Sequence, residues 1–140
     1  MAFSPSLAAM MSDELLVSRY QRRLDELVGL AGREVARTER EPPRLRAPAR
    51  FHLHELTDVR RVFLEVHGSD LLAAFRRHRD SGRLEIVTSA ATHGLLPLME
   101  PVPQAVRGQL QVAARNHRRQ FGRDALGIWL PEGGYSPGLD

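Results

Sequence analysis

The stretch ALGIWLPEGGYSPGLD, residues 125–140, decides the fold. Its first part, Ala125–Leu130, is short, apolar and bounded by turn residues, which is typical of a buried β-strand. Pro131 closes this strand, and Glu132 follows directly, ahead of two glycines. A carboxylate behind a buried strand and inside a turn indicates a group presented at the end of a sheet, where functional residues of α/β proteins gather.

A helix and a second strand precede this stretch. The helix begins at Pro103, a residue favoured at the first helical position, and ends at Gly122. Its apolar residues recur at three- and four-residue spacing and predict a buried stripe of Val106, Leu110, Ala114, His117 and Phe121. The sequence RLEIVTS, residues 83–89, is short and β-branched and predicts the strand.

Strands that alternate with helices pair in parallel, because each crossover helix returns the chain to the same end of the sheet. We therefore expect an α/β fold that is rich in helix. The carboxyl ends of both strands then lie at one rim. We expect His93 and Glu132 beyond the ends of adjacent strands at this rim.

The region before residue 83 predicts mostly helix. A strand end or loop is expected over 1–4, broken by Pro5, and a helix capped by Ser12 is expected over 13–38. A proline-containing loop over 41–50 and a helix over 55–67 follow, the helix with Val59, Phe63 and Val66 on one face and Gly68 after it. A further helix is expected between Ser69 and Gly82. The loop is not expected to be a domain linker, because neither flank is long enough to bury a core alone. We therefore expect the 140 residues to form one domain.

The composition is that of a soluble globular protein, with 42% hydrophobic and 26% charged residues. No apolar run approaches the roughly 20 residues needed to cross a bilayer, and no basic segment precedes the first apolar residues as in a signal peptide. We therefore expect a cytoplasmic protein with no membrane partner. The absence of cysteine excludes disulfides and thiol catalysis.

Three side chains are candidates for chemistry. Glu132 lies close to Trp129 and Tyr135, whose faces suit sugar rings and whose apolar character can tune a carboxylate; the alternative is a solvated turn residue. Glu85 in an apolar strand needs a partner or a polar cavity, unless it marks an exposed strand start. His93 either hydrogen-bonds a substrate hydroxyl or orders its own loop.

The sequence predicts neither a metal site nor a cofactor. The histidines form no short ligand pair with acidic support, apart from His52 to Glu55 in a predicted loop, and no phosphate loop or dinucleotide fingerprint is present. The helix over 103–123 contains five arginines and no acidic residue. Its one aromatic residue, Phe121, belongs to the predicted buried stripe and is not expected to stack on bases. We therefore expect no nucleic-acid partner.

Two longer motifs together resemble glycoside hydrolase family 57, and within it the 1,4-α-glucan branching enzymes. They are GRLEIVTSAATHGLLPLM, residues 82–99, and GIWLPEGGYSPGL, residues 127–139. The order of the other segments is similar to the family too, with FSPSLAAM, a long helix, a proline-rich loop and GSDLLAAFRRH. The resemblance covers essentially the whole chain.

This resemblance implies an incomplete, seven-stranded TIM-like barrel that cleaves α-glucosidic bonds with retention of configuration. It implies that Glu132 is the nucleophile and that Trp129 and Tyr135 stack on sugar or shape the pocket. It also implies that Glu85 and His93 form a pocket wall and contact the substrate. The implied partner is an α-glucan such as amylose or glycogen, and no cofactor is implied.

The match to the family is incomplete. Gly133 stands where the family usually has a side chain. This sequence has no counterpart of the family's first strand, which carries a His-x-Pro-type motif. It also has no counterpart of the family's later acidic motif, which contains the acid/base aspartate, and Asp140 does not match that aspartate. Residues 1–140 are therefore expected to be the amino-terminal part of the barrel, truncated at both ends and inactive alone. The alternative is a non-catalytic carbohydrate-binding or vestigial fragment of the same fold.

Overall fold

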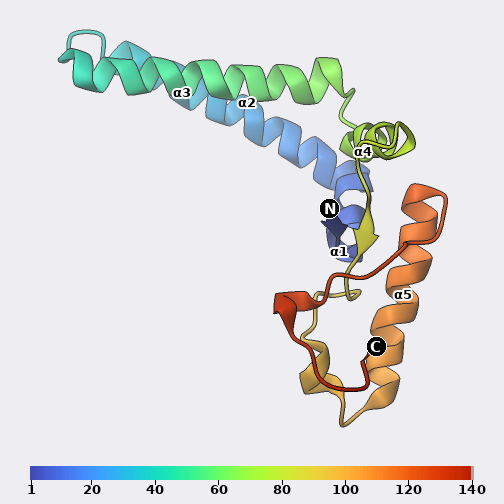
Figure 1. The fold of residues 1–140 in the computed structure, drawn as a ribbon. Helices are drawn as coiled ribbons and strands as arrows, with labels where there is room; N and C mark the ends of the chain where they lie inside the picture. The colour runs from blue at the N-terminus through green and yellow to red at the C-terminus, as the bar shows by residue number, and fades with distance from the viewer. Residues whose placement is uncertain (140) are drawn as a thin grey trace. The chain divides into compact units, whose positions relative to one another are not determined.

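The computed structural model describes residues 1–139, which form two compact units (Figure 1). The first unit combines Met1–Ser12 with the chain from Leu72 onward, and the second unit is Asp13–Leu71. The sequence did not indicate this division, because the expected single domain was inferred from length and from the short flanks of a predicted loop. No helix within residues 1–139 is both long and apolar enough to cross a membrane.

A small parallel sheet lies at the centre of the first unit. Strand β1 (Ala2–Phe3) pairs with β2 (Val87–Thr88) in the register Phe3 to Thr88. On its other edge Thr88 forms a parallel bridge with Ile128. The expected α/β character, with parallel strands and abundant helix, is therefore confirmed.

The strands are shorter than the expected ranges 83–89 and 125–130. Regular pairing covers only Val87–Thr88, and the later segment pairs at Ile128 alone. The reason is the length of the available partner, since a ladder cannot extend beyond the strand beside it. β1 has two residues before the chain turns into helix α1 (Pro5–Ser12).

Helix α1 was not predicted, because Pro5 was expected to break the chain. Proline is nonetheless well suited to the first position of a helix, where its missing N–H has no intrahelical partner to lose. Ser4 supports the start of α1: its carbonyl accepts from the Ala8 N–H at 3.0 Å and its Oγ accepts from the Leu7 N–H at 3.3 Å.

The core of the first unit joins the sheet to its helices. The Phe3 ring packs edge-on against Phe75, with centroids 4.8 Å apart, and lies 5.6 Å from the Phe121 ring. Phe75 comes from α4 (Leu71–Asp80) and Phe121 from α5 (Pro103–Phe121), so one strand residue connects both helices. The buried members of this core are Phe3, Ala8, Leu72, Ile86 and Phe121.

Helix α5 has the predicted ends, with Pro103 at the first position and Gly122 left-handed at φ 74° after the last. The predicted stripe is correct at His117 and Phe121 but wrong at Ala114, which is exposed, while Ala113 is buried. A spacing argument leaves the stripe free to rotate by one residue, and the contacts of the core decide which alanine faces inward.

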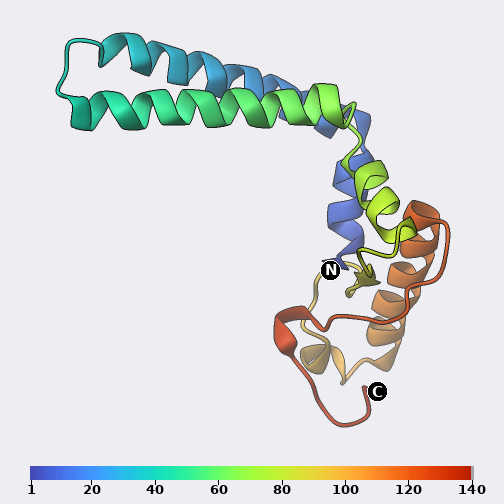
Figure 2. The same cartoon turned by 45° about the horizontal axis from the view of Figure 1, so that its top comes forward.

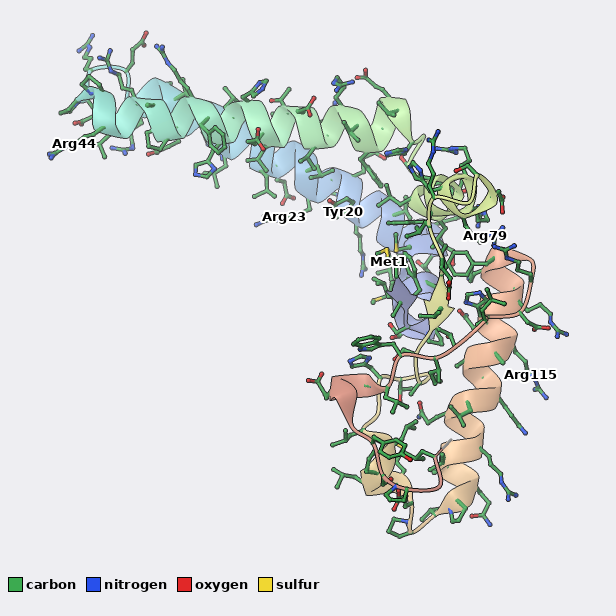
Figure 3. All side chains as sticks on the ribbon, in the orientation of Figure 1. Met1, Tyr20, Arg23, Arg44, Arg79 and Arg115 are labelled. Carbon is green, nitrogen blue, oxygen red and sulfur yellow. The ribbon has the colours of Figure 1, made fainter. Side chains whose placement is uncertain are left out.

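Two arginines of α4 cap the carboxyl end of α5. The Arg76 Nη1 donates to the Gln120 carbonyl at 2.9 Å, and the Arg79 Nη1 donates to the Phe121 carbonyl. Figure 3 shows Arg79 beside this end of α5. Cations at the carboxyl end of a helix satisfy carbonyls that have no intrahelical donor and oppose the negative end of the helix dipole.

The second unit is a hairpin of two helices, α2 (Glu14–Arg37) and α3 (Pro43–Arg61), which run side by side in Figure 1 and Figure 2. Its cap is Asp13, whose side chain accepts from the Leu16 N–H at 2.9 Å, and the expected cap Ser12 lies in α1 instead. Across the hairpin, the Arg60 Nε donates to the Asp25 Oδ1.

The expected loop over 41–50 is wrong, because most of it forms the start of α3. Pro42 is the N-cap and Pro43 the first residue, positions where proline is tolerated. Pro48 lies inside the helix and removes one hydrogen bond near its start, a local cost that the packing of α3 along α2 outweighs.

The expected face of the helix over 55–67 is only partly correct. After α3 the chain continues as a π-helix, η1 (Val62–Val66), which winds more widely than an α-helix and so rotates the later side chains. Phe63 is buried and packs edge-on against Tyr20 at 5.0 Å, but Val59 and Val66 are exposed. Gly68 follows with φ 56°, as predicted for a residue after a helix end.

Candidate functional site

His93 and Glu132 meet beyond the carboxyl ends of two neighbouring strand segments. The His93 Nε2 lies 3.5 Å from the Glu132 Oε1. His93 follows β2, and Glu132 follows the segment that pairs with β2 through Ile128. The expected placement of both residues at one rim of a parallel sheet is therefore confirmed by the geometry.

Both residues have a left-handed backbone. The φ angle is 58° at His93 and 54° at Glu132, and Ser69 is the one other non-glycine residue of 1–139 with a positive φ. Such a conformation costs on the order of 1–2 kcal/mol for a residue with a Cβ and persists only where the surroundings enforce it. Strained residues of this kind cluster at functional sites, which makes this pair a candidate site.

The turn around Glu132 has a local cause in the sequence. Pro131 opens a short 3₁₀ turn, η3 (Pro131–Gly133), and is itself buried. Gly133 continues the left-handed path at φ 65°, a backbone conformation that glycine adopts without a steric cost. Gly134 packs so closely on Leu95 that a Cβ there would overlap the leucine side chain.

Hydrogen bonds from two further residues hold the rim loops. The buried Ser89 donates from its Oγ to the Trp129 carbonyl at 2.9 Å, which ties the end of β2 to the segment that leads to Glu132. The Gln109 side chain on α5 bonds both the backbone and the hydroxyl of Thr92. Sequence reasoning missed both, because a serine and a glutamine carry no signal until the fold supplies their partners.

The site is open to solvent. The exposed fraction of the side chain is 77% for Glu132 and 49% for His93. Trp129 and Tyr135 are also exposed, at 65% and 57%. These aromatic residues flank Glu132 in the chain and present apolar surface that a flat sugar face could cover.

Glu85 does not lie at the sheet rim that presents His93 and Glu132. It precedes β2, whereas His93 follows it, and its side chain is exposed. Its carbonyl accepts from the amino group of Met1 at 2.7 Å, so its backbone helps to align β1. This arrangement corresponds to the alternative of an exposed strand start.

Among residues 1–139, no three histidine, aspartate or glutamate side chains gather in a way that could hold a metal ion. A pocket of about 390 Å³ lies between Ala125–Ile128 and α5, with Leu110 and Asp124 among its lining residues, and it includes neither His93 nor Glu132. Asp140 lies outside the described residues. The chemistry that the rim itself offers is that of a carboxylate beside an imidazole and two aromatic faces.

Comparison with known proteins places these features in a family. The family model for glycosyl hydrolase family 57 matches residues 7–140. The 1,4-alpha-glucan branching enzyme TK1436 of Thermococcus kodakarensis is 41% identical over 68 residues, which is 49% of this chain and 10% of that protein.

Solved structures of similar fold agree with the match to this family. The alpha-amylase AmyC of Thermotoga maritima aligns over 100% of this chain and 27% of its own, with a TM-score of 0.92 and 36% identity. The GH57-type branching enzyme of Pyrococcus horikoshii aligns over 94% of this chain and 24% of its own, with a TM-score of 0.85 and 29% identity. This chain thus spans about a quarter of the solved relatives, and it belongs to glycosyl hydrolase family 57.

Proposed function

We propose that this chain is part of an α-glucan-active, retaining glycoside hydrolase or transglycosylase of the 1,4-α-glucan branching type, in which Glu132 is the nucleophile. The observation that carries the proposal is the Glu132 carboxylate, fixed in a left-handed turn at the sheet rim with the His93 imidazole 3.5 Å away. The family membership and the branching-enzyme relatives support the substrate class. In this proposal, residues 1–140 are the amino-terminal part of an incomplete, seven-stranded TIM-like barrel.

The proposed reaction has two steps. In the first, a Glu132 oxygen attacks the anomeric carbon, a carboxylic acid protonates the leaving oxygen, and the glycosidic bond breaks as the glycosyl-enzyme bond forms. In the second, water or a glucan hydroxyl loses a proton to the same acid/base group, attacks the anomeric carbon and releases Glu132. The family resemblance assigns the acid/base role to an aspartate of a later strand.

The remaining candidates have supporting roles in this proposal. Trp129 and Tyr135 stack on sugar rings, since exposed aromatic faces beside a carboxylate suit pyranose surfaces. His93 contacts the Glu132 carboxylate, and in this proposal its imidazole also hydrogen-bonds a hydroxyl of the bound sugar. Glu85 enters only as a pocket wall by resemblance, since it lies before β2. The proposed setting is cytoplasmic, with no cofactor, no membrane and no nucleic acid.

The decisive experiment grafts this chain into a relative. AmyC of Thermotoga maritima aligns over the whole chain, so its matching segment can be replaced by residues 1–140. Activity on amylose is followed by iodine staining and product sizing, and the anomer of the first product by NMR. We expect a retaining activity that falls by at least about 10³-fold in Glu132→Gln, because the nucleophile is lost.

The matched control is Glu100→Gln, which changes an exposed glutamate of the same unit and should leave activity within about two-fold. Equal activity in Glu132→Gln and in the unmodified graft contradicts the proposal. Glucan binding without any Glu132-dependent turnover favours the non-catalytic carbohydrate-binding alternative, for which the open aromatic surface is the supporting observation.

A further inference from the structure

The turn that presents His93 is held by a side chain from α5. The Gln109 Oε1 accepts from the Thr92 N–H at 2.9 Å, and the Gln109 Nε2 donates to the Thr92 Oγ1, also at 2.9 Å. These two bonds use both ends of one planar amide, so they fix the orientation of Thr92 as well as its position. Thr92 directly precedes His93, so the orientation of Thr92 sets the direction in which the backbone enters the left-handed residue His93.

A local hydrogen bond also closes this turn. The His93 N–H donates to the Ala90 carbonyl at 3.0 Å, and the turn starts from a buried alanine pair, Ala90 and Ala91. A residue with a Cβ leaves the left-handed region unless other contacts prevent it. The amide of Gln109 supplies that contact from outside the turn.

Helix α5 is a firm anchor for such a contact. Ala113, His117 and Phe121 are buried along it. Gln109 lies one turn before Ala113, on the same side of the helix, and is itself half-buried. A shift of the turn would therefore require Gln109 to break its bonds or α5 to move within the core.

We propose that Gln109 is a positioning residue: its side-chain amide, bonded twice to Thr92, holds the left-handed turn that places the His93 imidazole against Glu132. The effect on glycosyl transfer rests on the proposed function, but the effect on the His93–Glu132 contact does not. Within residues 1–139 the hydrogen bonds of the Gln109 side chain go to Thr92, so in this proposal its effect on His93 passes through Thr92.

The test measures the contact directly in the 140-residue chain. NMR records the chemical shifts of the His93 ring in the unmodified chain and in Glu132→Gln. A change in these shifts between the two chains, called the His93 response below, shows that the ring lies close to the carboxylate. The rate of hydrogen exchange at the Thr92 amide reports whether the hydrogen bonds between Gln109 and Thr92 are formed. In Gln109→Met, which keeps the length but removes both bonds, we expect Thr92 exchange to rise by at least about 10-fold and the His93 response to Glu132→Gln to disappear.

The matched control is Gln111→Met on the same helix, where the side chain is exposed, and it should leave both signals as in the unmodified chain. Gln109→Glu should restore them, since one carboxylate oxygen can accept from the Thr92 N–H and the other from its hydroxyl. Gln109→Asn, which is one methylene too short to reach, should behave like Gln109→Met and serves if that variant does not fold.

A His93 response that survives in folded Gln109→Met, or a Gln109→Glu variant that restores nothing, overturns the proposal. The catalytic consequence is read separately in the AmyC graft, where Gln109→Met should lower kcat by about 10- to 100-fold with little change in KM. If the NMR response is lost as expected but turnover in the graft does not depend on Glu132, the positioning role stands and the proposed function fails.

Discussion

His93 and Glu132 carry backbone strain that a glycine would not feel. The sequence predicted that these two residues share a rim, because the order of strand, helix and strand is enough to place loop residues at one end of a parallel sheet. It did not predict their left-handed φ angles, because such a backbone is uncommon for any residue other than glycine, although histidine adopts it more often than most residues do. At Glu132 the turn has a local cause in Pro131 and Gly133, whereas at His93 it involves hydrogen bonds of Thr92 to Gln109 that exist only in the folded chain.

At His93 the strain predicts a conflict between stability and function. We expect His93→Gly to raise the free energy of unfolding by about 0.5–1 kcal/mol, because a left-handed backbone suits glycine and the half-exposed ring loses little packing. Urea denaturation of the 140-residue chain measures this. The matched change His54→Gly, on the exposed face of α3, should instead destabilise the chain by roughly 0.3–0.5 kcal/mol, the difference between the helix propensities of the two residues. A loss of stability in His93→Gly would show that the turn is not strained.

His117 makes the stability of the fold depend on pH. Its ring is 3% exposed, and its Nδ1 has no hydrogen-bond partner among residues 1–139. Burial lowers its pKa first, and the charges of Arg79 and Arg123 lower it further, while Asp124 opposes them. The unfolded chain therefore binds more protons than the folded chain between the folded pKa and the ordinary value of about 6.5.

The sign of the effect follows from this difference. The contribution of His117 is fully present above pH about 6.5 and is lost as the pH falls through the lowered folded pKa. We expect the urea midpoint of the chain to fall from pH 7.5 to pH 5, and His117→Phe to reduce this fall. An unchanged fall in a folded His117→Phe variant would assign it to other groups.

At the scale of elements, prolines were the main source of error. Pro5, Pro42, Pro43 and Pro48 were expected to break the chain or form a loop, but three of them lie in helices and Pro42 caps one. A proline has the same local signature before a loop and at the start of a helix, so only the helix that follows distinguishes the two. By contrast, the ends of α5 were predicted correctly, because Pro103 and Gly122 enclose a long periodic segment.

The contact between α4 and α5 predicts a stability effect at Arg79. Its side chain is largely buried, donates to the Phe121 carbonyl and forms an ion pair with Asp80 at 2.6 Å. We expect Arg79→Met, which keeps the apolar stem, to lower the free energy of unfolding by roughly 1.5–3 kcal/mol, because the last carbonyls of α5 lose a charged donor. Thermal and urea denaturation measure the loss. Arg77→Met, on the exposed face of α4, should change stability by less than about 0.5 kcal/mol.

At the scale of the whole molecule, the sheet of the first unit has open edges within residues 1–139. β1 pairs only with β2, and the segment at Ile128 pairs with β2 alone within residues 1–139. Unpaired edges and exposed apolar residues such as Leu126 and Trp129 favour association between copies.

We expect the 140-residue chain alone to show no measurable glucan cleavage or branching, although it contains Glu132. A retaining enzyme needs two carboxyl groups about 5 Å apart, and the loss of general acid catalysis alone lowers the rate by about 10²–10⁴-fold. The measurement compares the chain with its AmyC graft on amylose. Activity of the isolated chain that persists in Glu132→Gln would mean that a different residue carries the chemistry.

The division of the first unit into two stretches of sequence has a consequence for how the protein folds. Phe3 cannot pack against Phe121 until residue 121 has been synthesised, whereas the hairpin Asp13–Leu71 is contiguous and its helices contact near neighbours in sequence. Closing a loop of this length is entropically costly and slow, so local helices form ahead of non-local strand pairs. On the ribosome the hairpin would therefore fold first. Strand β1 would remain exposed to chaperones until Phe121 has been synthesised and the core of the first unit can form.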